Sequence, residues 1–481
     1  MSAPSKTQVS LENTTDTQLN PKRWKILALL GIIQFMLVVD TTVVNVALPH
    51  IQHDLGFSRT GLAWVVNSYI LMAGGLLLLG GRLADMFGRR RMFLLGVTIF
   101  GLASALSGAA ANPSMLVSSR FLQGLGEAFA APAALGLIAM LFTDRKERAK
   151  ALGAWGGIAG IAGVTGTIIS GLLTNFTSWR WIFYINLPIA LFGLIMIPRL
   201  VSKESAVGSK HRLDLLGALT VTGGLVAIVY GLLQATYHQW GSKFVGLPVA
   251  VGLTLLAATV LIERKSSDPL IPRNFFDSRT RVLANVAGLG LAMAFIAFIF
   301  LLTLFEQQTL GYSPLKGGLS YVPFGLALGV GVGMSAGMIP KAGIKPLMVI
   351  GFLGSAVGML LTGLYHPHAG YAADILPSLL TFGFFSGLLL PAAQTGALHE
   401  VTTHNSSLAS AVQQATSQVG GALGLAFLVT FALRHADHNI AHGFVLAFRI
   451  AAVVLVICAV VMGSLLGNSK TMAPIDAAVP E

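Results

Sequence analysis

The chain has a single cysteine and few charged residues, and both shortages exclude classes of protein. Cys458 is the only cysteine among 481 residues, so the chain forms no intramolecular disulfide and no thiolate cluster for a metal. Charged residues make up 10% of the sequence and hydrophobic residues 54%, against about 25% charged in a soluble domain. A soluble globular protein is therefore excluded, and the composition indicates an integral membrane protein.

Two further absences narrow the function. No GxxxxGK[ST] motif follows an apolar strand, so we do not expect this chain to hydrolyse ATP. The histidines in the outer loops have no spacing that enforces a metal site, and we expect no metal and no cofactor besides a proton gradient. The net charge of +12 is spread over many short loops rather than one face, which argues against a nucleic acid partner and fits membrane topology.

Long apolar runs fill most of the chain. A helix needs about 17 to 25 residues to cross roughly 30 Å of hydrocarbon. The sequence predicts an all-α integral membrane protein with fourteen transmembrane helices, at residues 25–48, 61–80, 92–111, 114–141, 150–173, 181–198, 213–234, 244–262, 282–305, 316–338, 345–364, 371–395, 407–432 and 443–467.

Two six-helix bundles account for twelve of the fourteen spans. We therefore expect two such bundles with two extra helices between them. Two related bundles are what a rocking transporter needs. The predicted parts are a disordered cytoplasmic tail at 1–24, an N-terminal bundle at 25–198, a linker with the extra pair at 199–280, a C-terminal bundle at 281–467 and a cytoplasmic tail at 468–481.

The distribution of lysine and arginine between the loops indicates which way the chain is oriented in the membrane. If the N-terminus is cytoplasmic, most of the 31 basic residues fall in loops on the cytoplasmic side. Those on the other side are Arg59, Arg180, Lys243, Lys316 and Arg434. The bias places both termini in the cytoplasm and the chain in the inner (cytoplasmic) membrane.

The densest charge between two apolar runs is the stretch GGRLADMFGRRR at 80–91. Glycine lets two helix ends approach closely, and arginines can hold carboxylates across a seam that opens and closes. The alternative is an ordinary cytoplasmic loop, which attracts arginine in any case. We expect a cytoplasmic gate made by Gly81, Asp85, Gly88, Arg89 and Arg90.

Ionisable residues inside a span cost about 2.5 to 3.5 kcal/mol each, so each needs a reason. Counting roughly 1.5 Å per residue places Asp40 about 13 Å and Arg120 about 10 Å below the same outer surface. On facing helices they can neutralise each other, or a proton or cationic substrate can compete for the aspartate. The alternative is a permanent structural ion pair.

Arg120, Gln123 and Glu127 share one helix face, because they stand at i, i+3 and i+7. A carboxyl group in the middle of a span is suited to taking a proton from one side and releasing it to the other. The alternative is a carboxylate hydrogen-bonded to a neighbouring helix. We expect Asp40, Arg120 and Glu127 to couple transport to protons, and the sequence leaves open which carboxylate is the carrier.

Polar residues on other spans are candidates for the substrate cavity. Gln413 and Gln414 belong to a polar stripe that either lines a cavity or bonds to neighbouring helices. Glu306 is expected to be a solvated residue at the outer mouth. The predicted cavity residues are Asn45, Gln123, Gln307, Gln413 and Gln414.

The fifth span is rich in glycine. Closely spaced glycines make a smooth ridge on which another helix can slide or pivot, although ordinary tight packing gives the same pattern. We expect a helix-packing pivot at Gly157, Gly163, Gly166 and Gly171.

Several motifs together carry a family resemblance: GGRLADMFGRRR, VVDTTVVNVALP, RFLQGLGEA, SWRWIFYINLP and LGYSPLKGGLSYVP. They resemble those of the major facilitator superfamily, in its fourteen-helix drug:proton antiporter branch. The resemblance implies that Asp40 is the proton or cation carboxylate, Arg120 its charged partner, and Asp85 with Arg89 the cytoplasmic lock. One departure is that Gly166 and Thr167 stand where the family's antiporter motif has glycine and proline.

These observations predict a transporter rather than an enzyme. We expect proton-coupled efflux of drugs or antibiotics by alternating access. The expected partners are a lipophilic or cationic small molecule, protons and the lipid bilayer, and the protein is expected to be a monomer. The alternatives are an exporter of an endogenous metabolite, peptide or siderophore, and a membrane sensor that does not transport.

Overall fold

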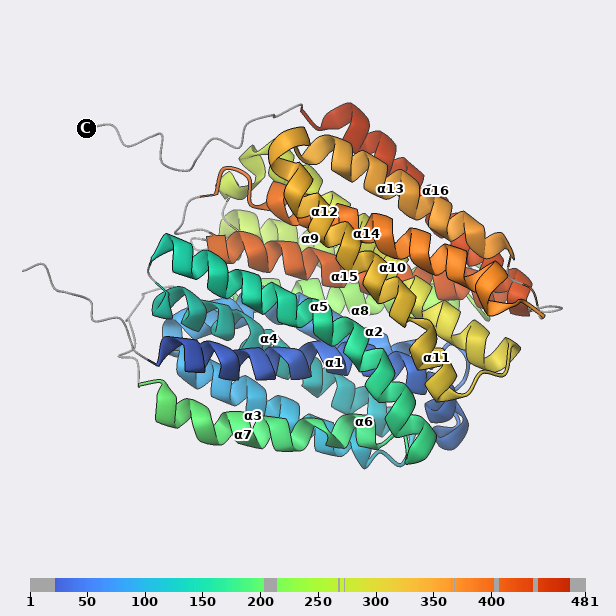
Figure 1. Ribbon diagram of the computed structural model, residues 1–481, viewed down its shortest axis with the longest axis horizontal. Helices are drawn as coiled ribbons and strands as arrows, with labels where there is room; N and C mark the ends of the chain where they lie inside the picture. The colour runs from blue at the N-terminus through green and yellow to red at the C-terminus, as the bar shows by residue number, and fades with distance from the viewer. Residues whose placement is uncertain are drawn as a thin grey trace, which may run out of the picture.

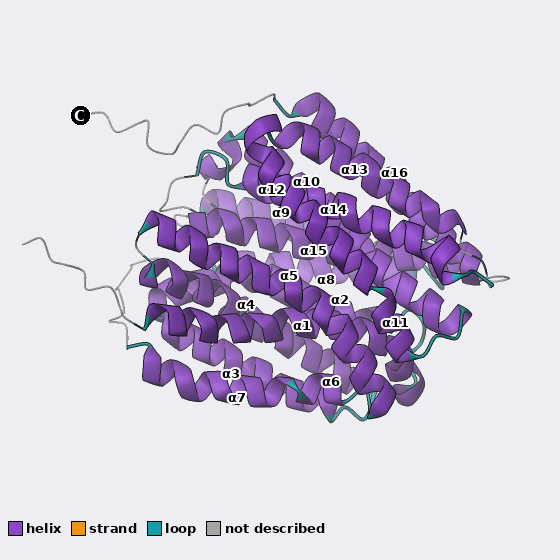
Figure 2. Ribbon diagram, viewed as in Figure 1, coloured by secondary structure: helices purple, strands orange, loops and turns teal. Residues whose placement is uncertain are grey.

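The computed structural model describes residues 22–142, 144–202, 214–266, 269–271, 273–364, 366, 368–401, 406–435 and 440–467. The described chain is almost entirely helical and contains no strand (Figure 2). In it, 14 helical segments are long and apolar enough to cross a membrane. The predicted all-α fold with fourteen spans is therefore confirmed. The predicted tails lie outside the described residues, except for residues 22–24, of which Arg23 and Trp24 belong to the first helix rather than to a disordered tail.

Figure 1 shows how the elements are arranged in space. The first group is α1 (Arg23–Leu55), α2 (Ala63–Phe87), α3 (Arg89–Gly108), α4 (Pro113–Leu141), α5 (Arg145–Phe176), α6 (Trp181–Tyr184) and α7 (Asn186–Leu200). Two further helices follow, α8 (Leu215–Gln234) and α9 (Lys243–Lys265). The last group is η1 (Arg273–Asp277), α10 (Arg279–Leu304), η2 (Phe305–Thr309), α11 (Pro314–Ser320), α12 (Val322–Ala342), α13 (Ile344–Leu361), η3 (Thr362–Leu364), η4 (Tyr371–Ile375), α14 (Leu376–Ala397), α15 (Ser406–Arg434) and α16 (Ile440–Leu465).

Single glycines turn the chain between antiparallel helices at two equivalent places. Gly88 joins α2 to α3 with φ 96°, and Gly343 joins α12 to α13 with φ 77°. A positive φ strains other residues, so glycine permits these very short turns. We call the end of the bundle that carries Gly88 and Gly343 the glycine-turn end, and the opposite end, which carries Pro314–Ser320, the α11 end.

Small residues bring helices into direct backbone contact within each group. A Cβ atom on Gly80 of α2 would stand 1.9 Å from the carbonyl oxygen of Ala128 on α4. A Cβ atom on Gly331 of α12 would stand 2.1 Å from the carbonyl oxygen of Phe384 on α14. Such contacts are the usual way that helices associate in lipid, where no hydrophobic effect drives them together.

The two groups of helices meet along two seams. At one seam α2 contacts α15, and at the other α5 contacts α11. The helices α8 and α9 pack on each other, and α8 also contacts α2 and α15. The extra pair therefore lies beside the first seam, while α5, α11 and α12 lie on the face turned to the viewer in Figure 1.

Candidate functional site

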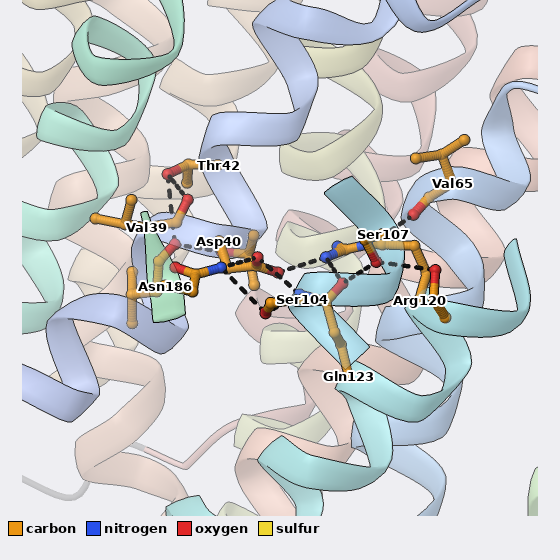
Figure 3. Close-up of polar contacts among 12 residues, drawn as sticks. Val39, Asp40, Thr42, Val65, Ser104, Ser107, Arg120, Gln123 and Asn186 are labelled. Carbon is orange, nitrogen blue, oxygen red and sulfur yellow. Dashed lines mark hydrogen bonds and ion pairs between the residues drawn. The ribbon is translucent and has the colours of Figure 1, made fainter. Parts of the chain in front are cut away.

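Asp40 of α1 is fully buried and lies at the centre of a polar network inside the first group of helices (Figure 3). Its Oδ2 atom pairs with the Arg120 guanidinium of α4. Its Oδ1 atom accepts hydrogen bonds from Gln123 Nε2 at 3.0 Å and from Asn186 Nδ2 at 2.8 Å. The carboxylate is thus bound by one cation and two amides.

Arg120 is held on several sides besides its pair with Asp40. Its Nε atom donates to the carbonyl oxygen of Val65 on α2 at 3.0 Å, and Nη1 donates to Gln123 Oε1 at 2.9 Å. The Tyr69 ring of α2 lies 4.3 Å from the guanidinium, close enough for a cation–π interaction. The network therefore joins α1, α2 and α4, and a change of charge at Asp40 bears on all three helices.

Gln123 lies inside this network and not in the cavity. Its amide group donates to Ser104 of α3 at 2.8 Å as well as to Asp40, and its Oε1 atom accepts from Ser107 at 3.1 Å. Both ends of the side chain are occupied, and it is fully buried. The prediction that Gln123 lines the substrate cavity is therefore wrong in this structure, and its place is beside the ion pair.

Glu127 of α4 is the second buried carboxylate of the first group. It is 6% exposed, and its Oε2 atom has no hydrogen-bond partner in the described part of the chain. Unlike Asp40, it lines a cavity and lies beside Tyr69. A carboxylate at a cavity wall can receive a proton or contact a cationic ligand.

The cavity lies between the two groups of helices and has a volume of about 370 Å³. One wall comes from α1, α2, α4 and α5, and the other from α10, α12, α14 and α15. Its lining is mostly apolar, with aromatic side chains from Tyr69, Phe295 and Phe324, while Arg120 and Glu127 supply its charged groups. An apolar cavity with a few polar groups is typical of a small-molecule site.

The predicted cavity residues divide into two sets. Asn45 of α1 and Gln414 of α15 line the cavity, as expected. Gln307 instead donates to the carbonyl oxygen of Val46 at 2.7 Å and links η2 to α1 at the α11 end. Gln413 contacts Ser417 on its own helix at 3.5 Å and is not among the lining residues of this cavity.

The gate residues lie at the glycine-turn end. Arg89 donates to Asp85 Oδ1 at 3.2 Å and to the carbonyl oxygen of Gly136 on α4 at 3.1 Å. Arg90 donates to the carbonyl oxygen of Pro198 on α7 at 3.2 Å. A small cavity of about 120 Å³ there is lined by Gly81, Asp85 and Arg89 together with three residues of α15, so the stretch faces the opposite group of helices.

Of the predicted pivot glycines, only those near the α11 end are packed. A Cβ atom on Gly166 would stand 2.0 Å from Thr42 Oγ1, and one on Gly171 would stand 2.8 Å from the carbonyl oxygen of Pro314. Among the described residues, Gly157 and Gly163 have no neighbour within 4 Å of such an atom. The expectation that these two pack against another helix is therefore not met, and Gly163 lines the cavity instead.

Two features of the site escaped the sequence analysis. Asn186 binds Asp40, and its only signal is a lone amide in the motif SWRWIFYINLP. Glu306 was expected to be solvated but is fully buried in η2. The helical count that placed it near the end of its span did not foresee that α11 folds over it.

A membrane bundle whose two groups of helices share a ligand-sized cavity, with a buried ion pair in one wall, has the architecture of a secondary transporter. The Major Facilitator Superfamily model matches residues 30–425. The chain therefore belongs to the Major Facilitator Superfamily, as the sequence motifs predicted; it is a multi-pass membrane transporter and not an enzyme.

Curated relatives include three bacterial proteins that match most of the chain. The puromycin resistance protein pur8 of Streptomyces alboniger is 40% identical over 424 residues, covering 87% of this chain and 84% of its own length. The lincomycin resistance protein of Streptomyces lincolnensis is 36% identical, covering 83% and 82%. The cephamycin export protein CmcT of Amycolatopsis lactamdurans is 36% identical, covering 81% and 80%.

Solved structures show the same fold at low identity. An auto-inhibited POT family peptide transporter aligns with a TM-score of 0.71 at 14% identity, covering 96% of this chain and 99% of that one. The human organic anion transporter MFSD10 aligns with a TM-score of 0.65 at 13% identity, covering 92% and 100%. These likenesses bear on the fold alone.

Proposed function

We propose that this chain exports antibiotic-like small molecules across the cytoplasmic membrane in exchange for protons, by alternating access. The observation that carries the proposal is a cavity shared by both groups of helices, with Glu127 and Arg120 in its wall and the buried Asp40 paired with Arg120 behind it. The printed functions of the relatives, resistance to puromycin and lincomycin and export of a cephamycin, support antibiotics as the substrate class.

The proton and the substrate act on the same charges. Glu127 faces the cavity and binds either a proton or the cationic group of a substrate. Protonation of Asp40 removes the charge that holds Arg120, and the freed guanidinium then turns to the Glu127 carboxylate on the same helix face. One proton thereby displaces a cationic substrate without any covalent chemistry.

The cavity suits a lipophilic substrate of moderate size. Its walls are apolar and aromatic, so a ligand gains affinity by leaving water and is oriented by the charged wall on α4. Each chain holds a complete cavity, which supports a monomer as the working unit.

The glycine-turn end is the cytoplasmic end in this proposal, because the basic residues of the loops gather there and positive loops stay inside. The Asp85–Arg89 pair then belongs to the cytoplasmic gate and contacts α4 through Gly136. The α11 end is then the outer end, and the contact between α11 and α5 there supports a conformation closed to the outside.

The test is substrate-dependent proton release from liposomes that contain the purified protein, with puromycin, lincomycin and a cationic dye as probes. When a pH gradient is imposed, we expect wild type to move at least one probe in exchange for protons. We expect the Asp40→Asn and Glu127→Gln variants to lose this transport. Asp54→Asn is the matched control, since Asp54 is 52% exposed and pairs with Arg180 away from the cavity. Transport that needs no gradient, or that survives both substitutions, would contradict proton coupling.

A further inference from the structure

Glu306 is a buried carboxylate that the mechanism above does not use. It lies in η2, a single π-helical turn that ends the α10 span, and it is fully buried. Its Oε2 atom accepts a hydrogen bond from Ser320 Oγ at 2.9 Å. Its Oε1 atom is buried and has no hydrogen-bond partner in the described part of the chain. An ionised carboxylate with one oxygen unsatisfied costs far more to bury than the neutral acid does.

Three titratable groups face this carboxylate from the elements around it, namely Lys316 of α11, Tyr312 of the preceding loop and Tyr371 of η4. The ammonium group of Lys316 lies over the Tyr312 ring, 3.7 Å from its centroid. Partial burial raises the pKa of Tyr312, and the Glu306 charge raises it further. On the other side of the turn, Phe305 packs against Phe444 of α16.

The carboxylate is joined to the contact that closes the α11 end. Its partner Ser320 is the last residue of α11. On the same short helix, a Cβ atom on Gly318 would stand 2.5 Å from the carbonyl oxygen of Thr167 on α5. The next residue in η2, Gln307, donates to Val46 of α1. Glu306 is therefore one hydrogen bond away from α11 and one residue away from a link between the two groups of helices.

Glu306 is separate from the site already described. It belongs to the second group of helices, and it does not line the cavity of about 370 Å³ that Glu127 lines. Gly317 of α11 lies beside its side chain, and a Cβ atom on Gly317 would stand in ordinary van der Waals contact, 3.7 Å from Glu306 Oε2.

We propose that Glu306 is a second proton-binding site, placed in the second group of helices, and that its proton controls the closure of α11 on α5. The neutral acid fits the closed packing seen here. The ionised form needs water or a cation at Oε1, which requires α11 to lift from α5. Raising the pH at the α11 end therefore favours opening, and a proton bound from that side favours closure. As a step of the transport cycle, this control of closure by the Glu306 proton rests on the proposed exchange of protons for substrate.

The test measures closure directly and needs no substrate. In a Cys458→Ala background, Leu315→Cys places the only thiol where α11 packs on Gly171 of α5. We expect its labelling by a water-soluble maleimide, corrected for the reagent's own pH dependence, to slow as pH falls, by up to about tenfold per pH unit, the limit for one proton. Adding Glu306→Gln, or Glu306→Met as a second neutral variant, should make labelling slow at every pH.

Asp54→Asn in the same background is the matched control, since Asp54 is exposed and pairs with Arg180, and it should keep the pH dependence. If the Glu306 variants keep it as well, the proposal is wrong. A pH-difference infrared spectrum gives a second readout, since wild type should show a protonated carboxyl band that Glu306→Gln lacks. Because neither measurement uses a substrate or a gradient, failure of the exporter proposal would leave both results readable.

Discussion

The Asp40–Arg120 pair offers the sharpest test of the site, because a structural ion pair and a coupling ion pair predict different results for the same variants. Asp40→Asn keeps the shape of the side chain but removes the charge that Arg120 pairs with. It also puts an amide among three donors, the guanidinium and the amides of Gln123 and Asn186. Arg120, only 1% exposed, then loses the carboxylate with which it pairs in this structure.

The size of the effect follows from burial. Removing one partner of a buried pair costs about 3 to 5 kcal/mol, because the other charge stays buried alone. Arg120 keeps its bonds to Val65 and its contact with Tyr69, so we expect the lower end of that range for Asp40→Asn. The double variant with Arg120→Gln removes both charges and should recover about 1 to 3 kcal/mol relative to the sum of the single changes.

The assay combines thermal unfolding in detergent with transport in liposomes for wild type, both single variants and the double variant. We expect stability to recover in the double variant while pH-driven transport stays lost. If the double variant transports its substrate against a pH gradient, the pair is only structural and the coupling role is refuted. If stability does not recover, the two charges are not coupled energetically and the geometry described here is wrong.

Three further predictions concern the gate, the pivot and the closed end. Asp85→Asn should reduce transport in liposomes but leave the melting temperature nearly unchanged, since such partly exposed pairs contribute at most about 1 kcal/mol. Gly166→Ala should lower the melting temperature, because overpacking costs about 1 to 3 kcal/mol. Gly163→Ala, whose Cβ atom meets no neighbour among the described residues, should be neutral or stabilising by up to about 1 kcal/mol. Gln307→Ala removes the bond to Val46 and should speed thiol labelling at the α11 end; unchanged labelling would show that this bond does not hold the closure.

The sequence predicted the number of spans and the meeting of Asp40 with Arg120 for physical reasons that act locally. Span length follows from the thickness of the hydrocarbon, and depth follows from the rise per residue, so two residues can be placed at one level without knowing the fold. Helical periodicity also put Gln123 on the same face as Arg120, although it could not tell that Asp40 would occupy its amide.

What the sequence could not supply was the neighbours of each helix. Asn186 and Ser104 join the network because α7 and α3 pack beside α1 and α4, and no periodicity within one helix encodes that. Glu306 is buried because α11 folds back over it, a tertiary event that a count along one span misses. The same limit applies to Gly157, whose spacing fits a packed ridge although no described atom lies within 4 Å of a Cβ atom built there.

The contact between α5 and α11 lies close to one end of the long helix α5, so α5 can rotate about it as a pivot. From Gly171 to the start of α5 at Arg145 the helix runs about 39 Å, whereas from Gly171 to Gly166 it runs only about 7 Å. A rotation of about 10° would therefore shift the packed surface by about 1 Å, within the tolerance of side chains, and would carry the far end through about 7 Å. Small adjustments at the contact are thus amplified into a displacement about as wide as an aromatic ring.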